Sequence, residues 1–247
     1  SPMSRGLGDV YKRQILSTLD FPEAKLLSEH FLIAKRIGML AEGNNAWLKL
    51  QQDGKIYGSV ITNGANTGRC THQRPNVAQT PSVGVPYGKE CRSLFTVPDG
   101  FVLIGCDASG LELRCLAHYL SAFDKGNFAR ELLNGDVHSK NQKQIGLPTR
   151  DLAKRVIYGV IYGIGNARLG AIVEKTSNEG GRIKEKLFET IPALKLLRDN
   201  VLVKAKNQKY LLGLDKRKLI PRSEHSSLNL LIQSSGALLI KMATVLL

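Results

Sequence analysis

The stretch RDLAKRVIYGVIYG, residues 150–163, carries the most informative pattern in this sequence. Arg150, Lys154, Tyr158 and Tyr162 recur every four residues, so a helix would set them along one side as a slowly drifting row. We call these four residues the cation–aromatic row. Apolar residues occupy the other side of the predicted helix and indicate a buried face, namely Ala153, Val156, Ile157, Val160 and Ile161.

This helix is predicted to run from about Thr149 to Ile164, and Pro148 with Thr149 supplies its start signal. Two cations followed by two aromatic rings would suit a triphosphate followed by a sugar and a base. Arg and Lys bind phosphate, and an aromatic ring offers a stacking face. The alternative is a solvated basic face with aromatic residues at the core boundary. The local pattern leaves both open.

Upstream, the apolar run FVLIGC at residues 101–106 is bounded by turn residues on both sides. It predicts a buried strand that leads into a helix over residues 111–123. Asp107 would then stand at the tip of the strand, which is a common place for a metal ligand. The alternative is a turn residue that caps the following helix. Glu112 adds little, since Glu is ordinary in a first helical turn.

The remaining pattern predicts mixed α/β structure without repeats. The predicted elements are a helix over 22–42, a strand over 55–62, an irregular segment over 63–88, one or two basic helices over 182–206 broken at Pro192, a hairpin of 210–214 with 218–220, and a last helix over 224–247. Residues 1–14 resemble translated adapter or vector sequence, which would form no part of the native fold. The alternative is a native terminus that is frayed.

Composition favours a polyanionic partner. The 247 residues include 35 Lys+Arg against 21 Asp+Glu, a formal net charge of +14. Nucleic acid is the first candidate, because Lys and Arg neutralise phosphates irrespective of sequence. A membrane surface would need a basic amphipathic helix or a polybasic block, and neither is clear. No apolar run is expected to span a bilayer. The four cysteines lack zinc-ligand spacing.

Five blocks together resemble family A, the DNA polymerase I-like DNA polymerases. DASGLELRCLAHYL (107–120) is similar to the family's motif A in its phage-type form, and residues 150–163 are similar to motif B, the nucleotide-binding O helix. TGRCTHQRPNVAQTP (67–81) resembles the segment at the primer–template minor groove, and NGDVHSKNQ (134–142) the stretch before the O helix. SSLNLLIQSSGALLIK (226–241) resembles the helix that leads toward motif C.

This resemblance implies a right-hand polymerase fold of mixed α/β class, with a partial thumb, a partial palm and helical fingers. The thumb remnant would cover 15–64, the palm 65–135 and 207–247, and the fingers 136–206. The implied function is template-directed DNA synthesis, in which two Mg²⁺ ions assist transfer of a dNTP to a primer 3′-hydroxyl.

Roles follow by resemblance, position by position. Asp107 would ligate both Mg²⁺ ions, and the carbonyl of Ala108 would help to hold one of them. Glu112 would fill the space of a ribose 2′-hydroxyl, which argues for deoxynucleotides because an extra hydroxyl would clash with a buried carboxylate. Arg150 and Lys154 would bind the triphosphate, and Lys154 would also protonate the pyrophosphate leaving group.

Further roles concern the sugar, the bases and the DNA. His138 would add a phosphate contact, Tyr158 would pack on the sugar, and Tyr162 would sit at the templating-base position. Residues implied to contact DNA are Arg69, Arg222, His225, Asn229 and Gln233. Of these, Arg69 and Gln233 would contact minor-groove acceptors that every base pair presents.

One departure from the family pattern concerns the second essential carboxylate, which the family places in motif C. The sequence ends at Leu247 before that motif, so we expect negligible polymerase activity from this chain alone. The alternatives are a non-catalytic DNA-binding remnant and a single-subunit RNA polymerase. Expected partners are primer–template DNA, dNTPs and, for the full-length enzyme, a processivity factor, with no membrane. An intracellular setting, such as the cytoplasm of a phage-infected bacterium, is expected.

Overall fold

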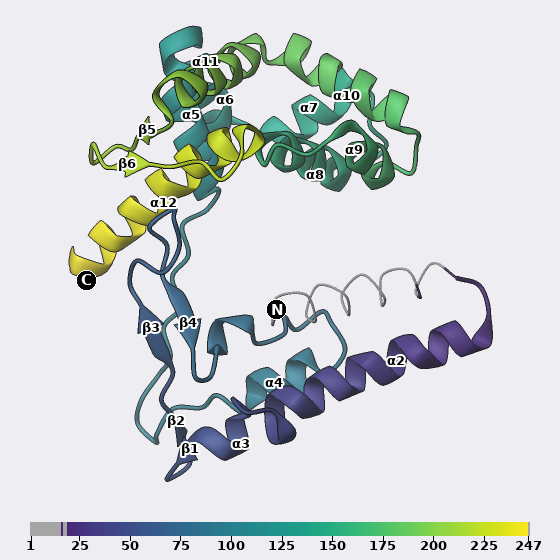
Figure 1. Cartoon of the computed structure of the whole chain (residues 1–247), viewed down its shortest axis with the longest axis vertical. Coiled ribbons are helices and arrows are strands. Elements are labelled where there is room, and N and C mark those ends of the chain that lie inside the picture. The colour runs from purple at the N-terminus through teal and green to yellow at the C-terminus, as the bar shows by residue number, and fades with distance from the viewer. Residues whose placement is uncertain (1–15, 17–18, 247) are drawn as a thin grey trace. The chain divides into compact units, whose positions relative to one another are not determined.

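The structure is a computed structural model that describes residue 16 and residues 19–246. The predicted non-native head, 1–14, therefore lies outside the described residues. The chain divides into two compact units (Figure 1). Unit 1 comprises Ser1–Ile61 and Thr71–Ile104, and unit 2 comprises Thr62–Cys70 and Gly105–Leu247.

Unit 1 is built on one long helix. α2 (Pro22–Ile37) begins with Pro22, whose fixed φ suits a first helical turn, and continues as the π-helical turn η1 (Gly38–Glu42). The predicted helix over 22–42 is thus confirmed. The other elements are α3 (Trp47–Leu50), β1 (Gln51–Gln52), β2 (Lys55–Ile56), β3 (Ser59–Ile61), β4 (Thr71–Gln73), η2 (Val77–Gln79) and α4 (Gly88–Ser93).

The strands of unit 1 are short antiparallel pairs. β1 pairs with β2, and β3 pairs with β4, with Val60 opposite His72. The single strand predicted over 55–62 is wrong in one respect, because it breaks between β2 and β3 at Tyr57 and Gly58. The segment predicted as irregular contains β4 and η2.

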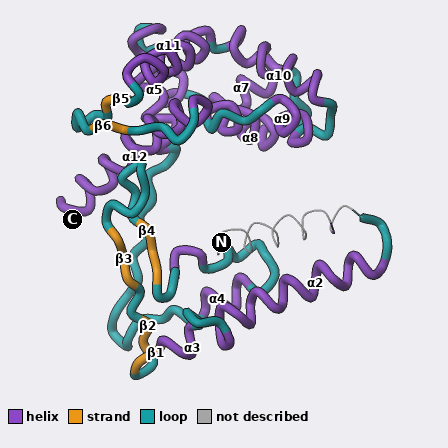
Figure 2. Tube along the Cα trace, viewed as in Figure 1, coloured by secondary structure: helices purple, strands orange, loops and turns teal. Residues whose placement is uncertain are grey.

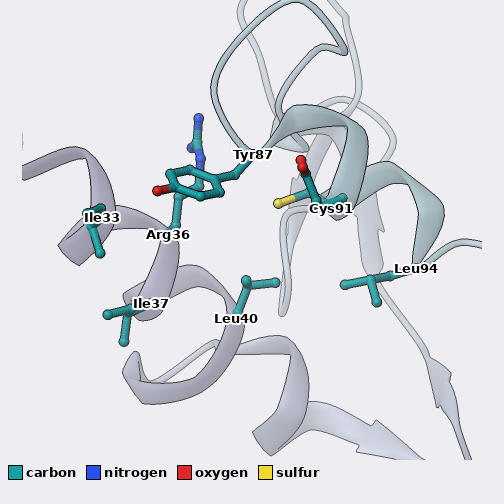
Figure 3. A pocket seen from close by; sticks show the side chains of 8 residues that line it. Ile33, Arg36, Ile37, Leu40, Tyr87, Cys91 and Leu94 are labelled. Carbon is teal, nitrogen blue, oxygen red and sulfur yellow. The ribbon is translucent and has the colours of Figure 1, made fainter. Parts of the chain in front are cut away.

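α2, η1 and α4 together line an apolar cavity in unit 1, with a volume of about 340 Å³ (Figure 3). Its lining residues are Ile33, Arg36, Ile37, Leu40, Tyr87, Glu90, Cys91 and Leu94. Arg36 donates a hydrogen bond from Nη2 to the Pro86 carbonyl at 3.5 Å, which links the two sides of this cavity.

Unit 2 is mostly helical (Figure 2). Its elements are α5 (Leu111–Asp124), α6 (Asn127–Asn134), α7 (Val137–Ile145), α8 (Arg150–Ile161), α9 (Asn166–Ile172), α10 (Ser177–Thr190), α11 (Pro192–Gln208), β5 (Leu211–Leu212), β6 (Lys218–Leu219), η3 (Glu224–Ser226) and α12 (Ser227–Leu246). The predicted hairpin is confirmed, with Leu211 opposite Leu219. The predicted helices at 111–123, 149–164, 182–206 and 224–247 correspond to α5, α8, the pair α10 and α11, and α12. The helices α6, α7 and α9 were not predicted.

The core of unit 2 joins α5, α8, α11 and α12. Leu120, Ile157, Leu194 and Ile232, one from each helix, have no exposed surface. Burial of these four and of the other apolar side chains in this core supplies most of the driving force for packing the helices. Tyr119 on α5 and Ser235 on α12 add a hydrogen bond of 2.7 Å between their hydroxyl groups.

The strand predicted at 101–106 is wrong. These residues have no regular secondary structure, and the side chains of Phe101, Val102, Leu103 and Ile104 are 71–84% exposed. An apolar run becomes a strand only when a neighbour supplies backbone hydrogen bonds. None of the strands in the described part of the chain pairs with it.

Among the described residues, one helical span, Glu224–Leu246, is long and apolar enough to cross a bilayer by length and composition. The expectation that no apolar run is long enough is therefore wrong. The first half of this helix packs in the core of unit 2, where Leu228, Leu230, Leu231 and Ile232 are buried. Such core helices pass the same test as membrane spans.

Candidate functional site

The cation–aromatic row is displayed along α8 as its spacing predicts. Thr149 caps the helix, since its hydroxyl accepts a hydrogen bond from the Leu152 N–H at 3.2 Å. The apolar side of α8 is buried, whereas Arg150 and Lys154 are exposed and Tyr158 is half-buried. The rings of Tyr158 and Tyr162 lie 6.1 Å apart. The exposed cations and the paired rings thus share one side of the helix.

A glycine turn fixes the end of this row. α8 ends at Ile161 with Tyr162 as its C-cap, and Gly163 follows with φ +74°, a backbone conformation that residues other than glycine rarely adopt. A Cβ atom on Gly163 would lie 2.2 Å from the His225 carbonyl oxygen. The close approach packs the η3 turn against the end of α8, so His225 lies next to the row through its backbone.

The aromatic end of the row meets Glu112. The Tyr162 hydroxyl donates a short hydrogen bond to Glu112 Oε2 in the first turn of α5. Burial and this bond to Glu112 raise the pKa of Tyr162 far above its ordinary value of 10. Burial, and then the charge of Glu112, also raises the pKa of Tyr158. Both phenols therefore stay protonated, and Glu112 faces the aromatic half of the row.

The cationic end of the row meets α7. The rings of His138 and Tyr158 lie 6.3 Å apart. Burial lowers the pKa of His138 below its ordinary 6.5, and the charges of Arg150 and Lys154 lower it further against the opposing effect of Asp136. His138 Nδ1 is buried without a hydrogen-bond partner in the described part of the chain. This ring is therefore neutral at pH 7 and sits among cations.

Asp136 belongs to the site but was not predicted. Its Oδ2 accepts from Arg150 Nε at 2.6 Å, and its Oδ1 accepts from Arg150 Nη2 at 3.2 Å. It also caps α7. An Asp ahead of a helix is a readable capping signal. The pairing with Arg150, fourteen residues away, depends on how α7 packs on α8 and has no local signal.

Arg69 reaches the aromatic end from a tight turn. The Ala65 N–H bonds to the Arg69 carbonyl at 3.2 Å, and the charge of Arg69 partly offsets the rise in the Tyr162 pKa. Arg217 packs so closely on Gly68 that a Cβ there would lie 2.6 Å from its guanidinium nitrogens. Arg217 also donates to Ser234 Oγ at 3.2 Å. Ser234 is the neighbour of Gln233 on α12, so the turn bearing Arg69 is tied to the helix bearing Gln233.

Other predicted residues lie outside this cluster of contacts. Asp107 is exposed in the irregular segment before α5 and has no hydrogen-bonded or ion-paired partner among the described residues. The Ala108 carbonyl accepts from the Leu111 N–H at 3.3 Å. Arg222 is exposed, and Asn229 is half-buried on α12. The structure brings together Glu112, His138, Arg150, Lys154, Tyr158, Tyr162 and Arg69.

The arrangement suits an anionic ligand that carries a flat or sugar-like group. Arg150 and Lys154 offer charged donors for oxyanions at one end of α8. Tyr158 and Tyr162 offer ring faces at the other end, and Glu112 places a carboxylate beside the Tyr162 hydroxyl.

Comparison with known proteins gives a consistent result. A family model described as DNA polymerase family A matches residues 7–247. The chain is 46% identical to the DNA-directed DNA polymerases of Enterobacteria phage T3 and Escherichia phage T7, over 91% of this chain and 36% of each relative. It is 31% identical to the DNA-directed DNA polymerase of Escherichia phage Phieco32, over 90% of this chain and 49% of that protein.

The fold also has a solved counterpart. The POL domain of Pol1 from M. smegmatis, in complex with DNA primer-template and dNTP, aligns with a TM-score of 0.70 at 22% identity, covering 90% of this chain and 42% of that chain. This likeness confirms the predicted polymerase fold of mixed α/β class, in which helices predominate. The chain spans about a third of the length of the T3 and T7 relatives.

Proposed function

The chain belongs to DNA polymerase family A, and we propose that it supplies the nucleotide-binding part of an enzyme for template-directed DNA synthesis. One observation carries this proposal: the cation–aromatic row of α8 meets Glu112 of α5 through Tyr162, and His138 of α7 faces Tyr158 beside the cations of the row. Positioning and charge neutralisation provide most of the catalysis in phosphoryl transfer, and this row offers both.

In this proposal the triphosphate of a dNTP lies at the start of α8. Arg150 and Lys154 bind its oxygens through charge-assisted hydrogen bonds, and His138 adds a third contact. Lys154 also gives a proton to the pyrophosphate that leaves when the primer 3′-oxygen attacks the α-phosphorus. The contact between the His138 and Tyr158 rings supports a continuous path from phosphate to sugar.

The sugar and base are assigned to the other end of the row. Tyr158 packs on the sugar, and Tyr162 occupies the templating-base position before a template base arrives. Glu112, held by the Tyr162 hydroxyl, excludes a 2′-hydroxyl. In this assignment Glu112 leaves a ribose 2′-hydroxyl without room, which distinguishes DNA synthesis from the single-subunit RNA polymerase alternative.

Primer–template DNA is the proposed macromolecular partner. Arg69 and Gln233 would contact minor-groove acceptors, while Arg222, His225 and Asn229 would lie along the DNA. The net charge of +14 supports phosphate binding. We assign the thumb remnant to 15–64, the palm to 65–135 and 207–247, and the fingers to 136–206. A processivity factor and an intracellular site of action belong to the same proposal.

Two Mg²⁺ ions are the proposed cofactor, with Asp107 and the Ala108 carbonyl as ligands. Mg²⁺ favours six oxygen ligands. Within the described residues, no group of three or more His, Cys, Asp or Glu side chains is placed to hold a metal. The described residues therefore do not form a complete metal site, and we assign no step to one.

Binding experiments on this chain test the proposal and separate it from its rivals. Fluorescence anisotropy with a labelled primer–template measures DNA binding, and a second titration adds dNTP or rNTP. We expect Arg69→Ala to weaken DNA binding, and Lys204→Ala, at an exposed site on α11, to change it little beyond the general charge effect. We expect Glu112→Ala to reduce the preference for dNTP over rNTP.

Each rival predicts a different result. A DNA-binding remnant would bind primer–template without dNTP, and an RNA polymerase would prefer rNTP. A chain that binds neither DNA nor nucleotide would refute the proposed function.

A further inference from the structure

We infer that Asp136 is a positioning residue of the nucleotide site, which holds the Arg150 guanidinium in the orientation that a triphosphate requires. The inference rests on the proposed function, because it assumes that Arg150 binds the phosphates. It adds a residue whose role is exerted through Arg150 and not by direct contact with the nucleotide.

The geometry of the pair sets the direction of the guanidinium. Asp136 accepts hydrogen bonds from Arg150 Nε and Nη2 at 2.6 and 3.2 Å. A guanidinium has five N–H donors in one plane, so this two-point contact fixes the plane and leaves three donors for another ligand. A Lys at position 150 could not be held in this way.

The carboxylate is itself held in place. Asp136 accepts from the N–H groups of His138 at 3.0 Å and Ser139 at 3.3 Å, and from Ser139 Oγ at 2.7 Å. These bonds anchor Asp136 at the start of α7, the helix that carries His138. One carboxylate thus joins the beginnings of α7 and α8, which carry His138 and Arg150, two of the three proposed phosphate-binding side chains.

Positioning explains this pair better than stability does. The side chains of Arg150 and Asp136 are 51% and 42% exposed, and exposed ion pairs contribute little to folding. Arg150 and the Ser139 hydroxyl hold the pKa of Asp136 well below its usual range, so the carboxylate is charged at neutral pH. Competition between Asp136 and phosphate for Arg150 would have the opposite effect on dNTP affinity. The two effects differ in sign.

The Asp136→Asn substitution shows directly whether Asp136 strengthens or weakens dNTP binding. Asn caps helices about as well as Asp, so α7 is kept while the ionic contact with Arg150 is lost. Circular dichroism checks that the helices are retained. We expect the dissociation constant for dNTP, in the presence of primer–template, to rise roughly two- to tenfold, since a long side chain must then be ordered on binding. Glu131→Gln, which removes the partner of Lys140 near the same helix, is the matched control and leaves dNTP binding unchanged.

A double-mutant cycle tests the route through Arg150. In an Arg150→Gln background, Asp136→Asn should cause no further loss of dNTP affinity. A ¹⁵N NMR signal from Arg150 Nε–H should exchange faster with water in Asp136→Asn than in the wild-type chain.

Four results overturn the inference. The first is dNTP binding by Asp136→Asn that is unchanged or tighter. The second is a full additional loss of dNTP affinity when Asp136→Asn is added to Arg150→Gln. The third is an Arg150 Nε–H exchange rate that Asp136→Asn leaves unaltered. If the wild-type chain binds no dNTP, the proposed function fails and this inference fails with it. If the wild-type chain binds dNTP and Asp136→Asn binds equally well, the inference alone fails.

Discussion

Gly163→Ala tests how the end of α8 is held against η3. Gly163 has φ +74°, and an alanine in this left-handed region costs about 1–2 kcal/mol. The added Cβ would also lie 2.2 Å from the His225 carbonyl oxygen and 3.0 Å from its carbon. Both are backbone atoms, so relief requires the turn to move, at an overpacking cost of about 1–3 kcal/mol. The expected loss in free energy of unfolding is therefore roughly 2–5 kcal/mol.

Gly146→Ala is the matched control for Gly163→Ala. Gly146 has φ +78°, but a Cβ there would meet no atom within 4 Å. Its expected cost is the conformational part alone, about 1–2 kcal/mol. Urea unfolding followed by circular dichroism measures both variants, since Trp47 belongs to unit 1 and would not report on α8. Equal losses in the two variants would refute the close contact between Gly163 and His225.

Three further predictions use the same chain. Tyr119→Phe removes the hydrogen bond to Ser235 and should lower the free energy of unfolding, measured in urea, by about 1 kcal/mol. A change below the error of the method would show that this bond does not stabilise the core. Leu194→Ala, at a fully buried position, should cost about 2–5 kcal/mol in the same assay, and a smaller loss would show that the site collapses around the cavity. His138 should titrate below pH 6.5 when followed by NMR. Because its pKa is lower in the folded state, neutral His138 contributes to folding stability above pH 6.5, and this contribution is lost as the pH falls through the lowered pKa. A His138 pKa at or above 6.5 would contradict its burial among cations.

The sequence predicts α8 well because its information is local. Arg150, Lys154, Tyr158 and Tyr162 are spaced four residues apart with apolar residues between them. A helix is the structure that places this row on one side and buries the apolar residues on the other. The structure has this helix, and its buried face consists of Ala153, Val156, Ile157, Gly159, Val160 and Ile161. The hairpin of β5 and β6 follows from its turn residues in the same way.

Tertiary contacts explain what the sequence could not predict. The apolar run at residues 101–104 is as suited to a strand as any in the chain, yet it is exposed, because strand formation depends on a partner. The Asp136–Arg150 pair depends on the packing of α7 on α8. The bond between Glu112 and Tyr162 joins residues fifty apart. The family resemblance assigned roles to both of these residues, but their direct contact becomes visible only in the structure.

The most direct measurement compares dNTP affinity in Lys154→Ala and Arg155→Ala. The two residues are adjacent on α8 and both exposed, and each variant removes one positive charge, but only Lys154 belongs to the cation–aromatic row. In titrations with primer–template present, we predict a loss on the order of tenfold or more for Lys154→Ala, typical of a lost charge-assisted hydrogen bond, and little change for Arg155→Ala. Equal effects of the two substitutions would mean that α8 attracts nucleotide by general charge alone, and would contradict the assignment of this row to the triphosphate.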